Sequence, residues 1–294
     1  LIQPGTWLAA WVGLAPLLLA IRSATPAQAA VRGLVAGFVY YGVILYWIIL
    51  FGALPWFLLV IYQAAYIALF AVVANRLWPE RLGWLGFLGI PAAWSVTEYL
   101  RMAGVYGFAW GSLAHTQSSN LPFLQASEFA GPCGISFALV FLNLAIAYAL
   151  SGRGKRRLLP LSLACLIVAV MCVYGFAVMR SSAEETTRHK IAIIQANMRN
   201  DFNPVPNYPD VAYERFSAMT RAAADGEVRL ALWPETSIPR DITSPGWADM
   251  IGQIASECQV DLLAGGYDHS DSPGQPGSYN ALFHFGKDGR VHGG

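Results

Sequence analysis

Long apolar segments separated by short polar links dominate the first 180 residues and restrict the folds open to this chain. Residues 1–180 hold ten Lys and Arg but only three Asp and Glu, whereas residues 181–294 hold nine and fifteen. A helix that crosses a bilayer core requires about 20 predominantly apolar residues. We therefore expect a multi-pass α-helical membrane bundle over residues 1–180. Its helices are predicted near 7–21, 33–51, 55–74, 82–100, 131–150 and 158–179.

Basic residues recur on every other link between these segments. Links one, three and five carry them, among them Arg22, Arg81 and Arg153, while the second link has no charged residue. Positively charged links favour the cytoplasmic side of a membrane, so we predict that these three links are cytoplasmic. The chain after Met179 would then lie on the opposite side, which in a bacterium is the periplasm.

The region 189–294 has a different pattern, in which short apolar runs alternate with helical periods. This alternation is typical of an α/β domain. Strands are predicted at 190–195, in the run that ends at Pro234, at 260–264 and at 279–285. Helices are predicted at 210–224 and 247–258, and Lys287-Asp288-Gly289 has the composition of a hairpin turn.

Glu235 stands at the end of one of these predicted strands. Leu230 and Leu232 give that run its alternation, and Pro234 stops it. Open α/β sheets place their chemistry at the carboxyl ends of strands, and the predicted strand 260–264, which is followed by Gly265-Gly266, is expected to run beside this one. We interpret Glu235 as a candidate catalytic general base. The alternative is a solvated carboxylate in a turn.

The sequence around Glu235 resembles a known family. Trp233-Pro234-Glu235 after a strand resembles the acidic motif of the carbon–nitrogen hydrolase (nitrilase) superfamily, and Gln195-Ala196-Asn197 resembles the opening strand of one branch of it, the apolipoprotein N-acyltransferases. The segment 198–204 departs from that branch, which leaves open which aromatic residue near Phe202 serves the site.

The membrane half carries a second match to the same branch. Residues 94–101 resemble its Trp-x-x-x-Glu-(aromatic)-x-Arg run, and similar motifs continue through 108–113 to 143, so the resemblance covers essentially all 294 residues. The candidate substrate-binding residues are Trp94, Glu98, Arg101 and Trp110. The alternative is that the aromatic residues anchor the membrane interface while Glu98 and Arg101 pair along one helix face.

The resemblance implies an activity as well as a fold. The fold is a membrane bundle followed by an α-β-β-α nitrilase-like sandwich, here incomplete. The activity is transfer of an acyl chain from phospholipid, through a Cys thioester, to the N-terminal amine of diacylglyceryl-cysteine lipoproteins. The superfamily's catalytic Lys and Cys come later in the chain, so neither Lys287 nor Cys258 is assigned to these roles. We therefore expect a fragment, cut at both ends and inactive by itself.

Composition limits the remaining possibilities. The net charge of +1 gives no signature of nucleic-acid binding, and the four cysteines have neither metal-ligand nor disulfide-framework spacing. We expect no cofactor, no metal and a monomer in the bacterial inner membrane. Two alternatives stay open, a membrane-tethered amidase or nitrilase acting on small amides, and a non-enzymatic membrane scaffold.

Overall fold

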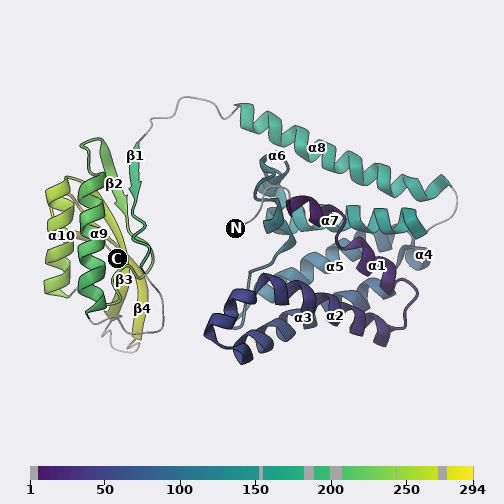
Figure 1. Cartoon of the computed structure of the whole chain (residues 1–294). Helices are drawn as coiled ribbons and strands as arrows, with labels where there is room; N and C mark the ends of the chain where they lie inside the picture. The colour runs from purple at the N-terminus through teal and green to yellow at the C-terminus, as the bar shows by residue number, and fades with distance from the viewer. Residues whose placement is uncertain are drawn as a thin grey trace. The chain divides into compact units, whose positions relative to one another are not determined.

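The computed structural model describes residues 6–151, 155–181, 189–198, 207–242, 244–270 and 277–293. The chain divides into two compact units, Leu1–Glu184 and Glu185–Gly294 (Figure 1). Two features of the sequence prediction, Arg153 in link five and the aromatic residue near Phe202, lie outside the described residues.

The first unit is helical, with 3₁₀ helices written η. Its elements are η1 (Thr6–Trp11), α1 (Ala15–Ile21), α2 (Pro26–Ile44), η2 (Tyr46–Phe51), α3 (Ala53–Arg76), α4 (Pro79–Leu82), α5 (Trp84–Met102), η3 (Leu113–Gln117), α6 (Leu121–Leu124), α7 (Ser127–Ser151), η4 (Lys155–Leu158) and α8 (Leu159–Ser181).

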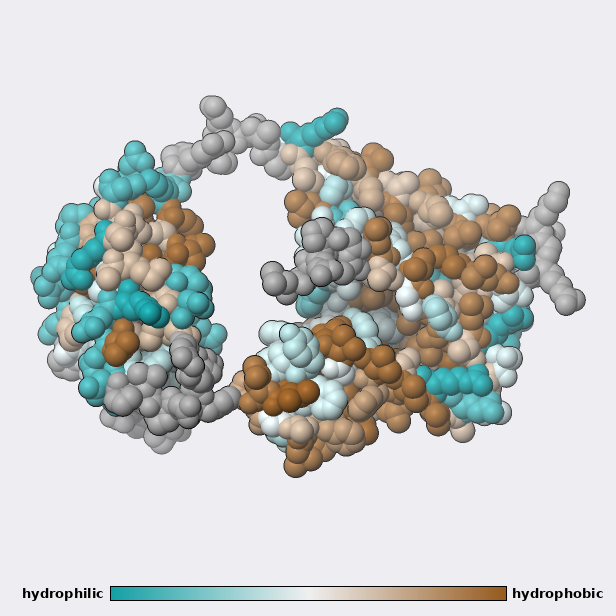
Figure 2. Space-filling view, in the orientation of Figure 1, coloured by the Kyte–Doolittle hydropathy of each residue, from teal (hydrophilic) through white to brown (hydrophobic). Residues whose placement is uncertain are grey.

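Four helices among the described residues are long and apolar enough to cross a membrane. They are Pro26–Ile44, Ala53–Leu82, Ser127–Ser151 and Leu159–Ser181. Trp7–Ile21 forms a shorter apolar helix, and α5 over the predicted span 82–100 is not among the four. Spans at these two places remain predictions. Apolar side chains cover much of the surface of this unit in Figure 2, as expected for a surface in contact with lipid.

Helix α2 differs most from its predicted bounds of 33–51. It begins at Pro26, because Thr25 and Gln28 form a capping box in which each side chain accepts the other's backbone N–H. Hydropathy misses this polar first turn. The helix ends at Ile44, and the apolar residues that follow form η2 before Gly52 takes a φ of 123° that favours glycine.

Small residues let α2 and α3 pack closely together. A Cβ on Gly33 would lie 2.6 Å from the Cβ of Ala71, and one on Gly37 would lie 2.8 Å from the Cα of Ala64. Helices in membranes associate through such close packing, since apolar contact with lipid competes with apolar contact between helices. Both glycines are therefore required by the contact and not by a turn.

The odd-numbered links meet at one end of this unit. Arg22 in link one lies 3.3 Å from the Glu80 carboxylate in link three, and its guanidinium donates to the carbonyl of Ser151 before link five. Asn75 at the end of α3 donates to the carbonyls of Ile21 (2.7 Å) and Ala24 (3.0 Å). The basic links one and three, and the end of the helix before link five, therefore lie together at one end of the helical unit.

The second unit is a five-stranded mixed sheet with two helices. Its elements are β1 (Lys190–Ile193), α9 (Tyr208–Ala223), β2 (Val228–Leu232), α10 (Pro245–Cys258), β3 (Asp261–Ser270), β4 (Gly277–Phe285) and β5 (Val291–Gly293). The strand order is β1-β2-β3-β4-β5, with β1 to β3 parallel and β3 to β5 antiparallel. Strand β3 continues beyond its predicted end at Ala264 through both glycines to Ser270, because β4 pairs with it along that whole length.

The two faces of this sheet differ. Helices α9 and α10 cover one face (Figure 1), where Phe216, Trp233 and Phe283 belong to the buried core. The other face carries apolar side chains that remain exposed, including Ile193 at 73% and Leu282 at 56%. An apolar sheet face is ordinarily packed against another layer, so the sheet presents a surface that a second layer can cover.

Candidate functional site

Glu235 lies in the turn directly after β2, at the carboxyl end of that strand. Trp233 anchors the turn, because its indole N–H donates to the hydroxyl of Thr220 (2.9 Å) and its ring stacks on Phe216. Ser237 fixes the other side, since both its N–H and its hydroxyl donate to the carbonyl of Gly265. The backbone on both sides of Glu235 is therefore fixed, by Trp233 before it and by Ser237 after it.

Gly265 permits the turn to lie against β3. A Cβ at this position would lie 2.7 Å from the Pro234 carbonyl oxygen and 2.8 Å from the Cα of Glu235. A larger residue would displace the turn. The sequence prediction that a glycine-bearing strand runs beside Glu235 is confirmed here, and the structure adds the reason for the glycine.

Asn280 of β4 is the partner of the Glu235 carboxylate. Its side-chain amide N–H donates to Oε1 of Glu235, and its amide oxygen accepts from the Thr236 hydroxyl at 3.4 Å. From the sequence, Asn280 is placed only within the predicted strand 279–285 and has no assigned role. The signal that could have found it is the β3–β4 pairing, which places Asn280 opposite Tyr267, two residues past Gly265.

A cavity of about 410 Å³ opens beside Glu235. Its lining comes from the segment after β1, from α9 and from the turn after β2: Gln195, Ala196, Asn197, Met198, Tyr208, Phe216, Pro234, Glu235, Thr236, Ser237 and Pro239. Glu235 itself is exposed to solvent. The described residues thus supply a carboxylate in an open cavity, without the burial that strengthens a carboxylate as a base.

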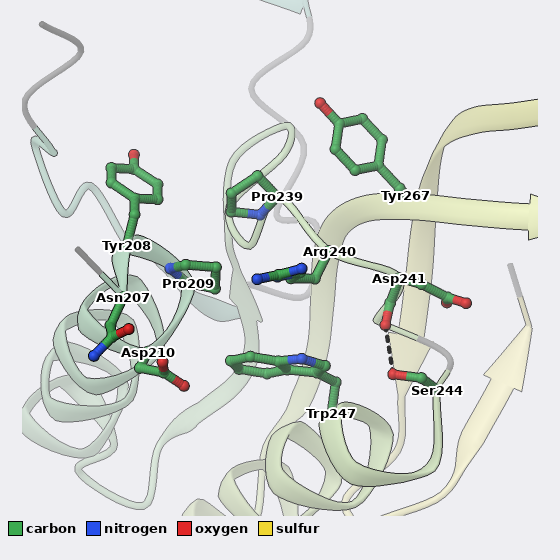
Figure 3. Close-up of a pocket in the computed structure, with 10 residues that line it drawn as sticks. All are labelled: Asn207, Tyr208, Pro209, Asp210, Pro239, Arg240, Asp241, Ser244, Trp247 and Tyr267. Carbon is green, nitrogen blue, oxygen red and sulfur yellow. Dashed lines mark hydrogen bonds between the residues drawn. The ribbon is translucent and has the colours of Figure 1, made fainter. Parts of the chain in front are cut away.

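A second cavity of about 720 Å³ adjoins the first, because both are lined by Tyr208 and Pro239. Figure 3 shows Arg240 extending into it above the indole of Trp247, with the phenol rings of Tyr208 and Tyr267 on either side. Sequence reasoning did not identify this cavity, since its walls come from α9, from the segment after Glu235, from α10 and from β3.

Among the residues that the structure describes, neither a cysteine nucleophile nor a lysine lines the cavity beside Glu235. None of the four cysteines lines the Glu235 cavity. Cys258 lies at the end of α10, and burial raises the pKa of its thiol, which makes it a poorer nucleophile. Lys287 lies in the turn between β4 and β5, as the sequence predicts, and Lys190 is paired with Asp225 and Glu227.

Glu98 and Arg101 hold the loop between α5 and η3 rather than each other. Glu98 is 4% exposed and accepts from the N–H of Leu113 (2.7 Å) and the hydroxyl of Ser112 (3.1 Å). Arg101 is 1% exposed and donates to the carbonyls of Phe108 (2.8 Å) and Trp110 (2.6 Å). The ion pair of the alternative interpretation is not formed, because the loop backbone provides each charged group with partners of its own.

The two tryptophans among the candidate residues lie in different surroundings. Trp94 is buried and packs edge-on against Phe70, with ring centroids 4.8 Å apart, so it does not belong to an interfacial aromatic belt. Trp110 is 55% exposed and contacts Trp47 of η2 at a centroid distance of 4.9 Å. Substrate binding by Trp94, Glu98, Arg101 and Trp110 stays a prediction.

Apolar helices long enough to span a membrane, followed by a mixed sheet with an acidic strand-end site, define the class: a membrane protein with an appended α/β unit. Residues 2–145 match the family model described as the apolipoprotein N-acyltransferase N-terminal domain. A protein named apolipoprotein N-acyltransferase from Geobacter metallireducens is 32% identical over 283 residues, which cover 90% of this chain and 53% of that protein.

Two further proteins of that name are similar. The one from a Nostoc species is 27% identical over 79% of this chain and 51% of its own length, and the one from Vibrio cholerae is 29% identical over 76% and 45%. The chain belongs to the apolipoprotein N-acyltransferase family. It spans about half the length of the curated relatives it matches.

Proposed function

We propose that this chain is the membrane-embedded and base-bearing part of an enzyme that transfers an acyl chain from phospholipid to the N-terminal amine of diacylglyceryl-cysteine lipoproteins. The observation that carries the proposal is Glu235, held at the end of β2 beside a cavity of about 410 Å³ in a chain of this family. The relatives' name favours acyl transfer over the amidase and scaffold alternatives.

The proposed chemistry has two half-reactions. Glu235 removes the proton of a cysteine thiol, the thiolate attacks the phospholipid ester, and a thioester forms as lysophospholipid leaves with a proton. The amine of the lipoprotein then attacks the thioester, which gives an amide and regenerates the thiol. Asn280 orients the Glu235 carboxylate for the first step through its amide N–H.

A nitrilase-like α-β-β-α sandwich is the proposed fold of the complete catalytic domain. The exposed apolar face of the sheet supports it, because that face is where a second sheet would pack, opposite the layer of α9 and α10. A covering layer would also reduce the exposure of Glu235. The relatives' additional length is sufficient for such a layer.

The chain by itself is proposed to be inactive, because no cysteine or unpaired lysine of the described residues lines the Glu235 cavity. The catalytic Lys and Cys would come from further sequence of the kind the relatives contain. We further propose a monomer in the bacterial inner membrane, with the sheet unit in the periplasm.

Thioester formation tests the proposed function. A chimera joins this chain to the part of the Geobacter relative that the alignment leaves unmatched, and radiolabelled phospholipid serves as acyl donor. We expect a labelled thioester in the chimera and none in the 294-residue chain. Glu235→Gln in the chimera should slow the labelling by at least about 100-fold, the lower range for general-base assistance. An unchanged rate would show that Glu235 is an ordinary turn residue.

A further inference from the structure

Thr236, the residue after Glu235, has a backbone conformation that threonine rarely adopts. Its φ is +49°, in the left-handed region. A β-branched residue is an outlier there, because its branched side chain crowds the backbone. Such strain persists only where the surrounding structure enforces it. The turn therefore holds Thr236 in a strained conformation, which a glycine would adopt without strain.

Hydrogen bonds between the turn and β3 enforce this conformation. The N–H of Trp233 donates to the carbonyl of Leu263 (2.8 Å), and the N–H of Ser237 donates to the carbonyl of Gly265 (3.0 Å). Four residue steps in the turn, from 233 to 237, thus lie against two steps in β3, from 263 to 265. The extra residues must leave the line of the strand and return to it. Thr236 is the last of them, so its left-handed backbone brings the chain back to Ser237.

The side chain of Thr236 begins a short chain of hydrogen bonds that leads to Glu235. The Thr236 hydroxyl donates to Oδ1 of Asn280 (3.4 Å), and Nδ2 of the same amide donates to Oε1 of Glu235. A carboxylate only accepts, so the amide nitrogen has to face Glu235 and the amide oxygen has to face Thr236. The amide is then held at both ends, and the hydroxyl is the group that holds its oxygen.

The strained backbone and the hydrogen bond occur in the same residue. Backbone geometry alone favours glycine at position 236, but glycine would leave Oδ1 of Asn280 without this donor. Thr236 and Glu235 both line the cavity of about 410 Å³. The strained residue therefore belongs to the candidate site, and its side chain accounts for a threonine where the backbone does not.

We propose that Thr236 is a positioning residue for acyl transfer. Its hydroxyl fixes the Asn280 amide, and the amide fixes the Glu235 carboxylate that removes the thiol proton. This inference rests on the proposed function and adds to it a residue that acts through another. Without the hydroxyl the amide is held at one end only and can rotate, so the carboxylate is less often aligned with the thiol.

Three substitutions at position 236 separate the hydroxyl from the backbone strain. Thr236→Val keeps the branched side chain, and with it the strain, but loses the hydroxyl. Thr236→Ser keeps the hydroxyl and removes the branch, whereas Thr236→Gly removes both. Stability should follow the strain, so we expect the thermal unfolding midpoint of Thr236→Gly to be at least that of the wild type, and that of Thr236→Val to be no higher.

The side-chain amide of Asn280 gives a readout that does not require catalysis. The 294-residue chain is prepared in detergent with isotopically labelled asparagine, and the Asn280 amide signal is identified by its loss in Asn280→Asp. NMR relaxation then reports the mobility of that amide on the ps–ns timescale. We expect a rigid amide in the wild type and Thr236→Ser, and a mobile one in Thr236→Val and Thr236→Gly. The same mobility in all four proteins would overturn the proposal.

The rate of thioester formation in the chimera gives the functional readout. Thr236→Val and Thr236→Gly should each slow it about fivefold, within the range for loss of one neutral hydrogen bond. Thr236→Ser should restore it. The loss is smaller than that expected for Glu235→Gln, because the base itself remains. Rates that follow the thermal midpoints, with Thr236→Gly at least as fast as the wild type, would show a purely structural role and refute the proposal.

The outcome is separable from that of the proposed function. If the wild-type chimera forms no thioester while the mobility of the Asn280 amide still depends on the hydroxyl, the acyl-transfer proposal fails and the chain of hydrogen bonds stands. If the wild-type chimera forms thioester and Thr236→Val forms it equally fast, the acyl-transfer proposal stands and the positioning role of Thr236 is refuted.

Discussion

The two units of this chain place the same two types of charged side chain, glutamate and arginine, in opposite environments. In the helical unit Glu98 and Arg101 are almost fully buried, and each forms hydrogen bonds with backbone groups of the segment that follows α5. In the sheet unit Glu235 and Arg240 are exposed and line cavities. Lipid tails offer no hydrogen-bond partners, so polar groups inside a membrane must form their hydrogen bonds with other groups of the protein. Burial with hydrogen-bond partners inside the protein therefore indicates a structural role, and exposure in a cavity indicates a role in binding or catalysis.

The orientation of the two units tests this contrast most strongly, because labelling is expected to be all or none. In a variant without its four native cysteines, a cysteine at Ser118 should react with a membrane-impermeant thiol reagent in intact cells. A cysteine at Arg81, in a basic link, should remain unlabelled. Both positions are solvent-exposed, so access to the side chain does not limit the comparison. The reverse labelling pattern would place the sheet unit in the cytoplasm.

Replacing Arg101 should have the largest effect on stability. Arg101→Met removes donors to Phe108 and Trp110 and leaves those loop carbonyls without a partner, at a cost of about 3 kcal/mol. The matched control is Arg22→Met, which removes an arginine whose pair with Glu80 is partly exposed and is worth at most about 1 kcal/mol. If Arg101→Met and Arg22→Met lower the free energy of unfolding in detergent by the same amount, the buried arginine contributes no more to stability than the exposed one, and the contrast fails.

Asn143 offers a smaller test of the same idea. Its amide accepts from the N–H groups of Leu14 (2.9 Å) and Ala15 (3.0 Å) and donates to the carbonyl of Ala10 (2.9 Å), so α7 caps the start of α1. Asn143→Leu should cost about 2 kcal/mol, since similar bonds in membranes contribute less than charged ones. Asn120→Leu, which loses one bond to Gln117, is the control. The difference is measured as resistance to denaturant.

The ion pair between Lys190 and Asp225 should give the smallest effect. The Lys190 ammonium lowers the pKa of the Asp225 carboxyl, with help from the N–H of Glu227. A carboxyl whose pKa is lowered by folding contributes stability above its unfolded pKa and loses it as pH falls through the folded value. The temperature of the thermal unfolding midpoint of the sheet unit should therefore decrease as the pH is lowered below about 4. Asp225→Asn should make that fall shallower, and an identical pH profile would contradict the assignment.

The sequence predicted what depends on local pattern and missed what depends on distant partners. Hydropathy and alternation located the apolar helices, the strand before Glu235 and the turn at Lys287. The start of α2 was missed, because Thr25 and Gln28 are polar and contribute to the helix through capping. Asn280 and the loop contacts of Glu98 could not be predicted, since each partner lies at least 14 residues away in the chain and depends on how strands or helices pair.

Two carboxylates give the most direct test of the contrast between structure and chemistry. Glu98→Gln and Glu235→Gln are the same near-isosteric change, one in a buried backbone contact and one in an open cavity. In the chimera, Glu98→Gln should lower the midpoint of thermal unfolding, while the folded molecules form thioester at the wild-type rate. Glu235→Gln should leave the midpoint unchanged and slow thioester formation at least about 100-fold. Loss of rate in the folded Glu98→Gln protein, with little change for Glu235→Gln, would contradict the account.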